Sequence, residues 1–347
     1  MDLNKITIKA VKPIVGQQMQ DKLDRLAKPQ RGLGNLERMV TKIASIQETL
    51  DIQVDRRTCL VFAADHGIER EQVSATPREV TSKQAINTIN GHTTVAVLAH
   101  QNRCKVTVID VGVDGLPASK KIINHKISDG TKDFLQENAM SRQEAVKAIK
   151  VGYEVAEKEL REGAQLLLIG ELGIGNTTTA STLMAAITGL PTELIVGAGS
   201  NISSKRFKHK IQVINEALRK RSFNQDDPVD LLAKVGGFEI GAMCGAILKA
   251  AEQGVPLIMD GFIANVAALL AQKINPNSVG YLIASHLSRE PGAKQALNLL
   301  DCEPVLNLDL AVGEGSGAVL LLSMIDAMQA ILQGMNTTDD LNFEFTK

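Results

Sequence analysis

The sequence predicts an α/β fold in which a doubly wound parallel sheet carries helices on both faces. Six short runs rich in aliphatic and β-branched residues alternate with helical patterns, the order typical of parallel sheets. The runs show no period-two alternation, as expected of strands that are buried on both faces. Both ends of the chain have helical patterns instead, so the predicted sheet occupies the middle of the chain.

The predicted elements follow one another along the chain. Apolar residues at helical spacing mark a short helix around Met19, Leu23 and Leu26 and a longer one over 34–50. A capping box, Ser141-x-x-Glu144, begins a helix between the second and third strands. A last helix covers 325–335, before a polar tail. The predicted strands are 59–65, 105–112, 165–171, 256–261, 279–286 and 304–314.

Composition excludes several classes of protein. The formal net charge of −1, the 3% aromatic content and the absence of Trp argue against nucleic-acid binding. The four cysteines are far apart and form no CxxC pair, which predicts reduced thiols, no metal site and a cytoplasmic location. The longest apolar run, 318–325, is much shorter than the ~20 residues of a membrane helix, so we expect no membrane partner.

Polar clusters follow the predicted strands. They are 65–67, 171–176, 260–261, 285–286 and 313–315. Ligands of doubly wound sheets bind outside the carboxyl ends of the strands. The convergence of these clusters at one edge of the sheet predicts an active site there, although any single cluster could be ordinary loop chemistry.

Two Gly-rich loops predict anion binding. In 170–180 the glycines permit a sharp turn, and Asn176, Thr177 and Thr178 open a helix whose N-terminus favours a phosphate. A capped strand-to-helix turn without a ligand is the alternative. The second loop, 197–210, continues into a helix with Lys205, Lys208 and Lys210. For each of these lysines taken alone, a solvated surface charge is favoured.

Glu314 is the candidate general base. It stands between glycines ahead of an apolar helix, where burial would raise its pKa towards neutrality. An exposed glutamate stabilised by the helix dipole is an equal alternative. The pair Asp65-His66 is less informative, because Asp65 is expected to hold loop backbone and His66, like His286, is more often structural.

Several motifs in order resemble the nicotinate-nucleotide–dimethylbenzimidazole phosphoribosyltransferase family. The resemblance extends from about Lys28 to about Gln333. Its motifs are FAADHG (62–67), GELGIGNTTTA (170–180), VGGFEIGAMCGAIL (235–248), DGFIANVAAL (260–269), ASHLSREPGA (284–293) and LDLAVGEGSGA (308–318). Two other functions fit the sequence less well. A dinucleotide-dependent oxidoreductase lacks its GxGxxG motif here, and a non-catalytic nucleotide or base sensor would not need Glu314.

The resemblance implies the residues of the site. It implies that Glu314 is the catalytic base and that Glu171 is a second catalytic glutamate. Contacts to the base fall on Thr76, Gln84, Gly313 and Gly315. Contacts to the nucleotide and its phosphate fall on Gly173, Gly175, Asn176, Thr177, Thr178, Gly199, Ser200, Lys210, Asp260 and Ser285. The family implies small-molecule substrates, nicotinate mononucleotide and a benzimidazole-type base, and no cofactor or metal.

The resemblance also implies a Rossmann-like sheet, a small helical domain formed from both chain ends, and a homodimer. We expect the helical domain at 1–55 and 325–347 and the catalytic α/β domain at 56–324. Three residues depart from the usual motifs. Gly32 replaces Ser in KPxGSLG, Thr179 replaces Pro in NTTPA, and Thr76 replaces Ser in the base pocket. The last keeps a hydroxyl and adds a methyl, which could change the preferred base.

Overall fold

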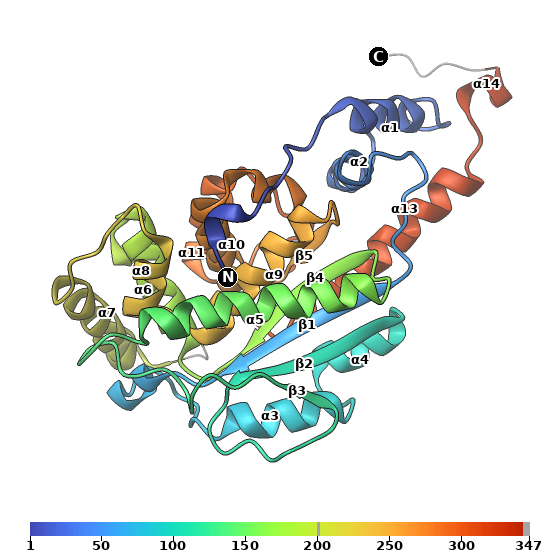
Figure 1. The fold of residues 1–347 in the computed structure, drawn as a ribbon. Coiled ribbons are helices and arrows are strands. Elements are labelled where there is room, and N and C mark those ends of the chain that lie inside the picture. Colours follow the sequence, from blue (N-terminus) through green and yellow to red (C-terminus); the bar gives the residue numbers. More distant parts are fainter. Residues whose placement is uncertain (200–201, 343–347) are drawn as a thin grey trace.

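The computed structural model describes residues 1–199 and 202–342 and contains a six-stranded parallel sheet (Figure 1). The strands lie in the order β3-β2-β1-β4-β5-β6, so the chain reverses its direction across the sheet between β1 and β4. This arrangement confirms the doubly wound parallel sheet. The strands are β1 (Arg57–Ala64), β2 (Cys104–Gly112), β3 (Ile122–Asn124), β4 (Leu166–Leu172), β5 (Leu257–Met259) and β6 (Leu282–Ala284).

Helices cover both faces of the sheet, which explains why the strands are apolar throughout. In β1, Leu60 and Phe62 belong to one buried core, whereas Cys59 and Val61 belong to the other. The first core includes α5 (Arg142–Arg161), α6 (Asn176–Thr188), α7 (Ser204–Arg219), α8 (Pro228–Val235), α9 (Phe238–Glu252), α10 (Phe262–Ile274) and α11 (Pro291–Leu299). The second includes α1 (Ile14–Asp24), α2 (Asn35–Gln47), α3 (Val80–Ile89), α4 (Thr94–Gln101), α12 (Ser316–Leu320) and α13 (Leu322–Gly334).

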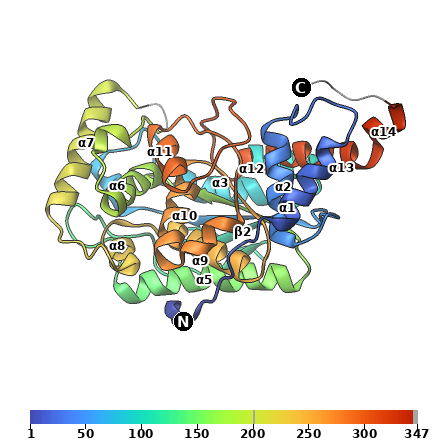
Figure 2. The ribbon, with the colours of Figure 1, turned by 90° about the horizontal axis from the view of Figure 1, so that it is seen from above.

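The two helical ends of the chain lie side by side (Figure 2). Helices α1, α2 and α13 pack together, and the backbone amide of Ala27 donates to the carbonyl of Asn336 across 2.9 Å. The short helix α14 (Thr338–Leu341) follows. The first residues take a different course, since Asn275 and Asn277 donate to the carbonyls of Ile6 and Ile8. The boundaries expected for a small helical domain stay a prediction.

The expectation of a sixth strand over 304–314 is wrong. The segment makes one parallel bridge, between Leu306 and His286, and then leaves the edge of the sheet. Asp309 has a left-handed backbone (φ 54°), which ends the extended course, and Leu308 is 52% exposed. The apolar content of the segment resembled that of a buried strand, but most of the segment has no neighbouring strand to pair with. The sequence pattern also missed β3, whose three residues are too few to give a signal.

The expectation that no apolar stretch approaches the length of a membrane helix is also wrong. Helices α12 and α13 together form a 19-residue stretch, Ser316–Gly334, that is long and apolar enough to cross a membrane by length and composition alone. In the structure, Leu321, Leu322 and Ile325 of this stretch are buried in the second core. Its charged residue, Asp326, accepts a hydrogen bond from Nη1 of Arg57 at 3.2 Å, and 39% of its most apolar window is buried inside the structure.

Candidate active site

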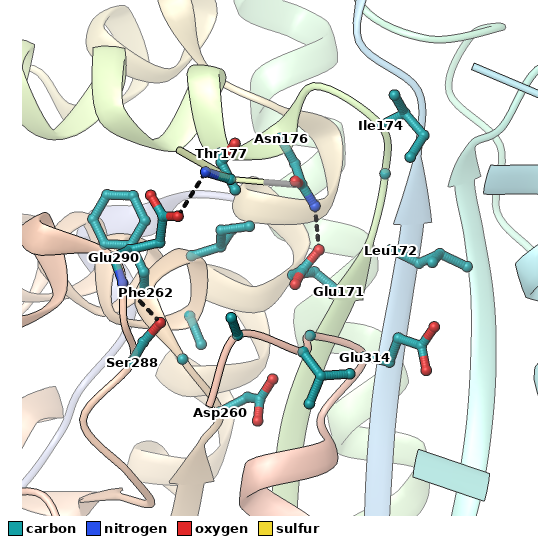
Figure 3. Close-up of a pocket in the computed structure, with 18 of the residues that line it drawn as sticks. Glu171, Leu172, Ile174, Asn176, Thr177, Asp260, Phe262, Ser288, Glu290 and Glu314 are labelled. Carbon is teal, nitrogen blue, oxygen red and sulfur yellow. Dashed lines mark hydrogen bonds between the residues drawn. The ribbon is translucent and has the colours of Figure 1, made fainter. Parts of the chain in front are cut away.

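A cavity of about 380 Å³ lies at the carboxyl ends of β4 and β5 (Figure 3). This is the position at which doubly wound sheets bind ligands, next to the point where the strand order reverses. Ten of the residues expected in the site line the cavity: Thr76, Gln84, Glu171, Gly173, Asn176, Thr177, Gly199, Asp260, Gly313 and Glu314. The strand order therefore gathers residues from widely separated parts of the chain.

The turn 313–315 holds Glu314 in a strained conformation. Glu314 has φ 68° and Gly315 has φ 91°, and the left-handed region costs a residue with a side chain roughly 1–2 kcal/mol. Asp260, which follows β5, offsets this cost. Its carboxylate accepts hydrogen bonds from the backbone amides of Gly315 (3.1 Å), Gly317 (2.8 Å) and Ala318 (3.1 Å). Asp260 thus fixes the turn that presents Glu314, in addition to lining the cavity.

Glu314 is buried, with 8% of its surface exposed. Burial raises the pKa of Glu314 above its usual value, the hydrogen bond from Gln84 lowers that pKa, and the charge of Asp260 raises it. The pKa of Glu314 is raised overall, which brings its titration closer to neutral pH. A carboxylate of this kind, at the wall of a cavity, is suited to accept a proton.

Glu171 is the one glutamate of β4, and its surroundings differ from those of Glu314. Burial raises the pKa of Glu171 well above its usual value, and the charges of Asp260, Glu239 and Glu314 add to the effect. The side-chain amide of Asn176 donates to Oε2 of Glu171. The protonated form of Glu171 is therefore favoured relative to that of an ordinary glutamate. Two neighbouring carboxyl groups with different environments can serve as a base and as a hydrogen-bond donor.

A second chamber of about 90 Å³ adjoins the main cavity and shares Gly173, Asn176, Thr177 and Gly199 with it. It begins at the N-terminus of α6, where no side chain caps the helix and the dipole favours an anion. Lys210 of α7 lines this chamber, and burial lowers the pKa of Lys210 to about 8. Glycine backbone, a helix N-terminus and a buried lysine are together suited to a phosphate.

Of the three lysines expected on this helix, Lys210 alone lines the chamber. Lys205 and Lys208 are exposed, so the solvated interpretation is confirmed for them, whereas Lys210 is buried. Its Nζ donates to the Thr177 hydroxyl and to the Gly197 carbonyl, both at 3.1 Å.

The other expected residues lie at the edges of the site or outside it. Gly175 and Thr178 line the smaller chamber and not the main cavity. Gly315 and Ser285 line neither, and the Ser285 hydroxyl donates to the backbone carbonyl of Asp260 at 2.9 Å. Ser285 therefore helps to fix the backbone of Asp260 and does not face the cavity. Ser200 lies outside the described residues.

Three polar residues of the cavity were missed from the sequence. One is Thr81 of α3, whose hydroxyl accepts a hydrogen bond from the amide of Ile174 at 3.1 Å. Ser288 and Glu290 follow β6 and line the cavity. Both stand in the motif ASHLSREPGA, and the signal that could have identified them is the polar cluster ahead of a helix that begins with Pro291. The apolar wall was also not predicted residue by residue. It consists of Val80, Leu172, Ile174, Phe262, Ile263, Ala264, Ala311 and Val312.

The acid–histidine pair beside β1 makes its contacts within the fold and lines neither chamber. Asp65 accepts a hydrogen bond from the amide of Asp114 at 2.9 Å. His66 is fully buried, with Nδ1 2.9 Å from the Thr179 hydroxyl and Nε2 3.1 Å from Glu239. Thr179, which departs from the usual motif, thus supplies a hydroxyl to this histidine. Within 1–199 and 202–342, no group of three His, Cys, Asp or Glu side chains is placed to hold a metal ion.

The chain is similar to known proteins over most of its length. A family model described as phosphoribosyltransferase matches residues 8–342. The nicotinate-nucleotide–dimethylbenzimidazole phosphoribosyltransferase of Desulforamulus reducens is 42% identical over 323 residues, 92% of each chain. That of Chloroflexus aurantiacus is 41% identical over 341 residues, 97% of each chain. The crystal structure of CobT from Thermus thermophilus matches with a TM-score of 0.90 and 39% identity, over 96% of this chain and all of that one.

Proposed function

Since the chain belongs to the nicotinate-nucleotide–dimethylbenzimidazole phosphoribosyltransferase family and is an enzyme of that family, we propose that it moves the 5-phosphoribosyl group of nicotinate mononucleotide to a benzimidazole-type base. With 5,6-dimethylbenzimidazole as the acceptor, the products are α-ribazole 5′-phosphate and nicotinate, for the nucleotide loop of cobamides. The observation that supports this most is the pairing of a buried carboxylate with an anion chamber in one continuous site.

The donor needs no acid to release its leaving group. The pyridine nitrogen of nicotinate mononucleotide is positively charged, and cleavage of its bond to C1′ releases a neutral ring nitrogen. The donor also carries no pyrophosphate whose charge must be neutralised. The protein's task is to hold the phosphate and the sugar so that C1′ faces the acceptor, and such positioning alone lowers the barrier substantially.

Glu314 acts on the acceptor. One nitrogen of the benzimidazole attacks C1′, and the ring would become cationic if the other nitrogen kept its proton. The Glu314 carboxylate takes that proton as the new bond forms, a contribution of roughly 10²–10⁴-fold in rate. Attack opposite the leaving group inverts C1′, which converts a β-nucleotide into an α-riboside.

Glu171 acts on the sugar. It stands between Asn176, at the entrance of the anion chamber, and the turn that carries Glu314, and a ribose that joins phosphate to base must pass this point. A protonated Glu171 can donate a hydrogen bond to a ribose hydroxyl. The apolar residues around Phe262 and Leu172 offer contacts to the flat rings, as is usual in pockets for small ligands.

We further propose a homodimer that works in the cytoplasm, with small molecules as its substrates and no cofactor. We propose that the part of the cavity around Thr76 determines which base is preferred. The extra methyl group of Thr76, compared with Ser, can change the selectivity between two bases by ~1–3 kcal/mol. The test is to incubate the protein with nicotinate mononucleotide and a panel of bases and to identify the ribosides by mass. Release of nicotinate with formation of an α-riboside phosphate is expected, and no riboside with any base would contradict the proposal.

A further inference from the structure

Glu290 has no part in the steps above, yet its carboxylate lies in the wall of the cavity. It precedes α11, in the loop that follows β6. Its Oε1 accepts a hydrogen bond from the backbone amide of Gly199 at 2.9 Å (Figure 3). Among the described residues its Oε2 has no hydrogen-bond partner, although this oxygen is shielded from solvent. A negative charge beside a predicted phosphate site needs an explanation, because it should repel the ligand.

The explanation is the contact of Lys210 with the same backbone turn, 197–199. Lys210 donates to the carbonyl of Gly197, two residues before the amide that Glu290 holds. A methyl group added to Gly199 would lie 3.6 Å from Nζ of Lys210, and one added to Gly197 would lie 2.2 Å from Oε2 of Glu290. The backbone 197–199 therefore lies between the buried Lys210 ammonium and the Glu290 carboxylate, and each of them makes one hydrogen bond to it.

Burial alone would favour the neutral form of Lys210, and it lowers the pKa of the lysine to about 8. Glu290 is the charged group that acts against this effect. Among residues 1–199 and 202–342, other elements bring no comparable group to the lysine. Thr177 of α6 does not titrate in the ordinary pH range, Glu193 of η3 (Thr192–Leu194) is exposed, and Glu71 meets α7 through its backbone carbonyl, which contacts His209.

We propose that Glu290 is a positioning residue for the donor's phosphate: its carboxylate fixes the turn 197–199 against Lys210 and supplies the counter-charge that keeps the buried lysine cationic. The inference rests on the proposed function, because it assigns the phosphate of the donor to the chamber of Lys210. It adds that the charge of Glu290 sets the upper pH limit of phosphate binding.

The sign of the effect follows from the charges. The Lys210 ammonium is present below its pKa and is lost as the pH rises through it. Removal of the Glu290 charge takes away an interaction that favours the ammonium, so the pKa of Lys210 falls further. Each unit by which it falls reduces the cationic fraction about tenfold at pH values well above the pKa. At pH 6 the lysine is cationic in both proteins.

The decisive variant is Glu290→Gln, which keeps the shape and an acceptor for the Gly199 amide but removes the charge. Glu303→Gln, at an exposed glutamate that pairs with Arg38 and lines neither chamber, is the control for the loss of one carboxylate charge. The Lys210 side chain is titrated by NMR in protein with ¹³C-labelled lysine, without substrate, and its resonance is assigned with Lys210→Arg. We expect a lower titration midpoint for Lys210 in Glu290→Gln and an unchanged one in Glu303→Gln.

Binding of inorganic phosphate to the same proteins is then measured by calorimetry at pH 6 and pH 9. Glu290→Gln should match the unmodified protein at pH 6 and bind up to about tenfold more weakly at pH 9. An unchanged midpoint, or equal weakening at both pH values, would overturn the inference. These measurements involve no turnover. If they succeed and no base yields a riboside, the proposed reaction fails while the action of Glu290 on Lys210 stands.

Discussion

Gln84 donates a hydrogen bond from its side-chain amide to Oε1 of Glu314 across 2.9 Å, although the two residues are 230 positions apart in the chain. Gln84 comes from α3, beyond β1, and Glu314 from the turn before α12. Asn87 in turn donates to Oε1 of Gln84 at 3.1 Å, which fixes the orientation of the amide. The proposed base is thus oriented by a helix from a distant part of the chain.

Substitution of Gln84 by Met should shift the pH dependence of turnover. The hydrogen bond from Gln84 lowers the pKa of Glu314, so its loss raises that pKa further. A base acts in its deprotonated form, and the acid limb of kcat against pH should therefore move to higher pH. Asn87→Ala, which removes only the support of Gln84, should move the limb in the same direction but less. If the acid limb of Gln84→Met stays at the same pH, the titration of Glu314 does not cause that limb.

Substitution of Glu314 by Gln should lower turnover at least about a hundredfold, because the acceptor can no longer lose its proton to the protein. The fold and the affinity for nicotinate mononucleotide should be retained. Circular dichroism and calorimetry check these two points, and single-turnover release of nicotinate checks the rate. Near-normal turnover would remove Glu314 from the mechanism.

Substitution of Lys210 by Ala should raise KM for the donor more than KM for the base. A hydrogen bond between charged groups contributes about 1.5–3 kcal/mol, so an increase of at least about tenfold in the donor's KM is expected. Lys208→Ala, at an exposed neighbour on the same helix, is the control. An unchanged donor constant would leave Lys210 without a role in binding.

Substitution of Asp260 by Asn should destabilise the protein and lower turnover together. The new amide group would face the backbone N–H of Gly315, which now donates to Oδ2 of Asp260. Loss of a buried, charge-assisted hydrogen bond lowers the free energy of unfolding by about 2 kcal/mol. Urea unfolding measures this change, with Asp309→Asn at an exposed site as the control. Unaltered stability would mean that the turn does not depend on Asp260.

Substitution of Gly170 by Ala should displace the catalytic turn without touching the ligands. The added methyl would lie 2.3 Å from the Gly315 amide nitrogen and 2.5 Å from the carbonyl carbon of Glu314. Overpacking of this kind costs typically about 1–3 kcal/mol, and kcat should fall more than donor affinity. Gly334→Ala, where nothing lies within 4 Å of the new methyl, should leave both constants unchanged. Equal kcat in the two variants would contradict this.

The errors of the sequence analysis have a common physical origin. The segment 304–314 resembles a buried strand in its apolar content, but its backbone pairs with the edge of the sheet only at Val305 and Leu306, and the left-handed Asp309 ends its extended course. The 19-residue length of Ser316–Gly334 was hidden because Asp326 interrupts the apolar run, and its partner Arg57 lies at the start of β1. Neither a lateral neighbour nor an ion-pair partner can be seen in a local pattern.

By itself, the sequence determined the alternation of strands and helices, the polar clusters at the strand ends and the placement of Glu314 between glycines. These features depend on local backbone preferences and on apolar spacing, which act over a few residues. The tertiary structure alone decided that Gln84 faces Glu314, that Lys210 is buried while Lys208 is not, and that Glu290 lies opposite Lys210. Burial and charge at a site depend on which distant segments the sheet order brings together, and the pKa values of its residues follow from that assembly.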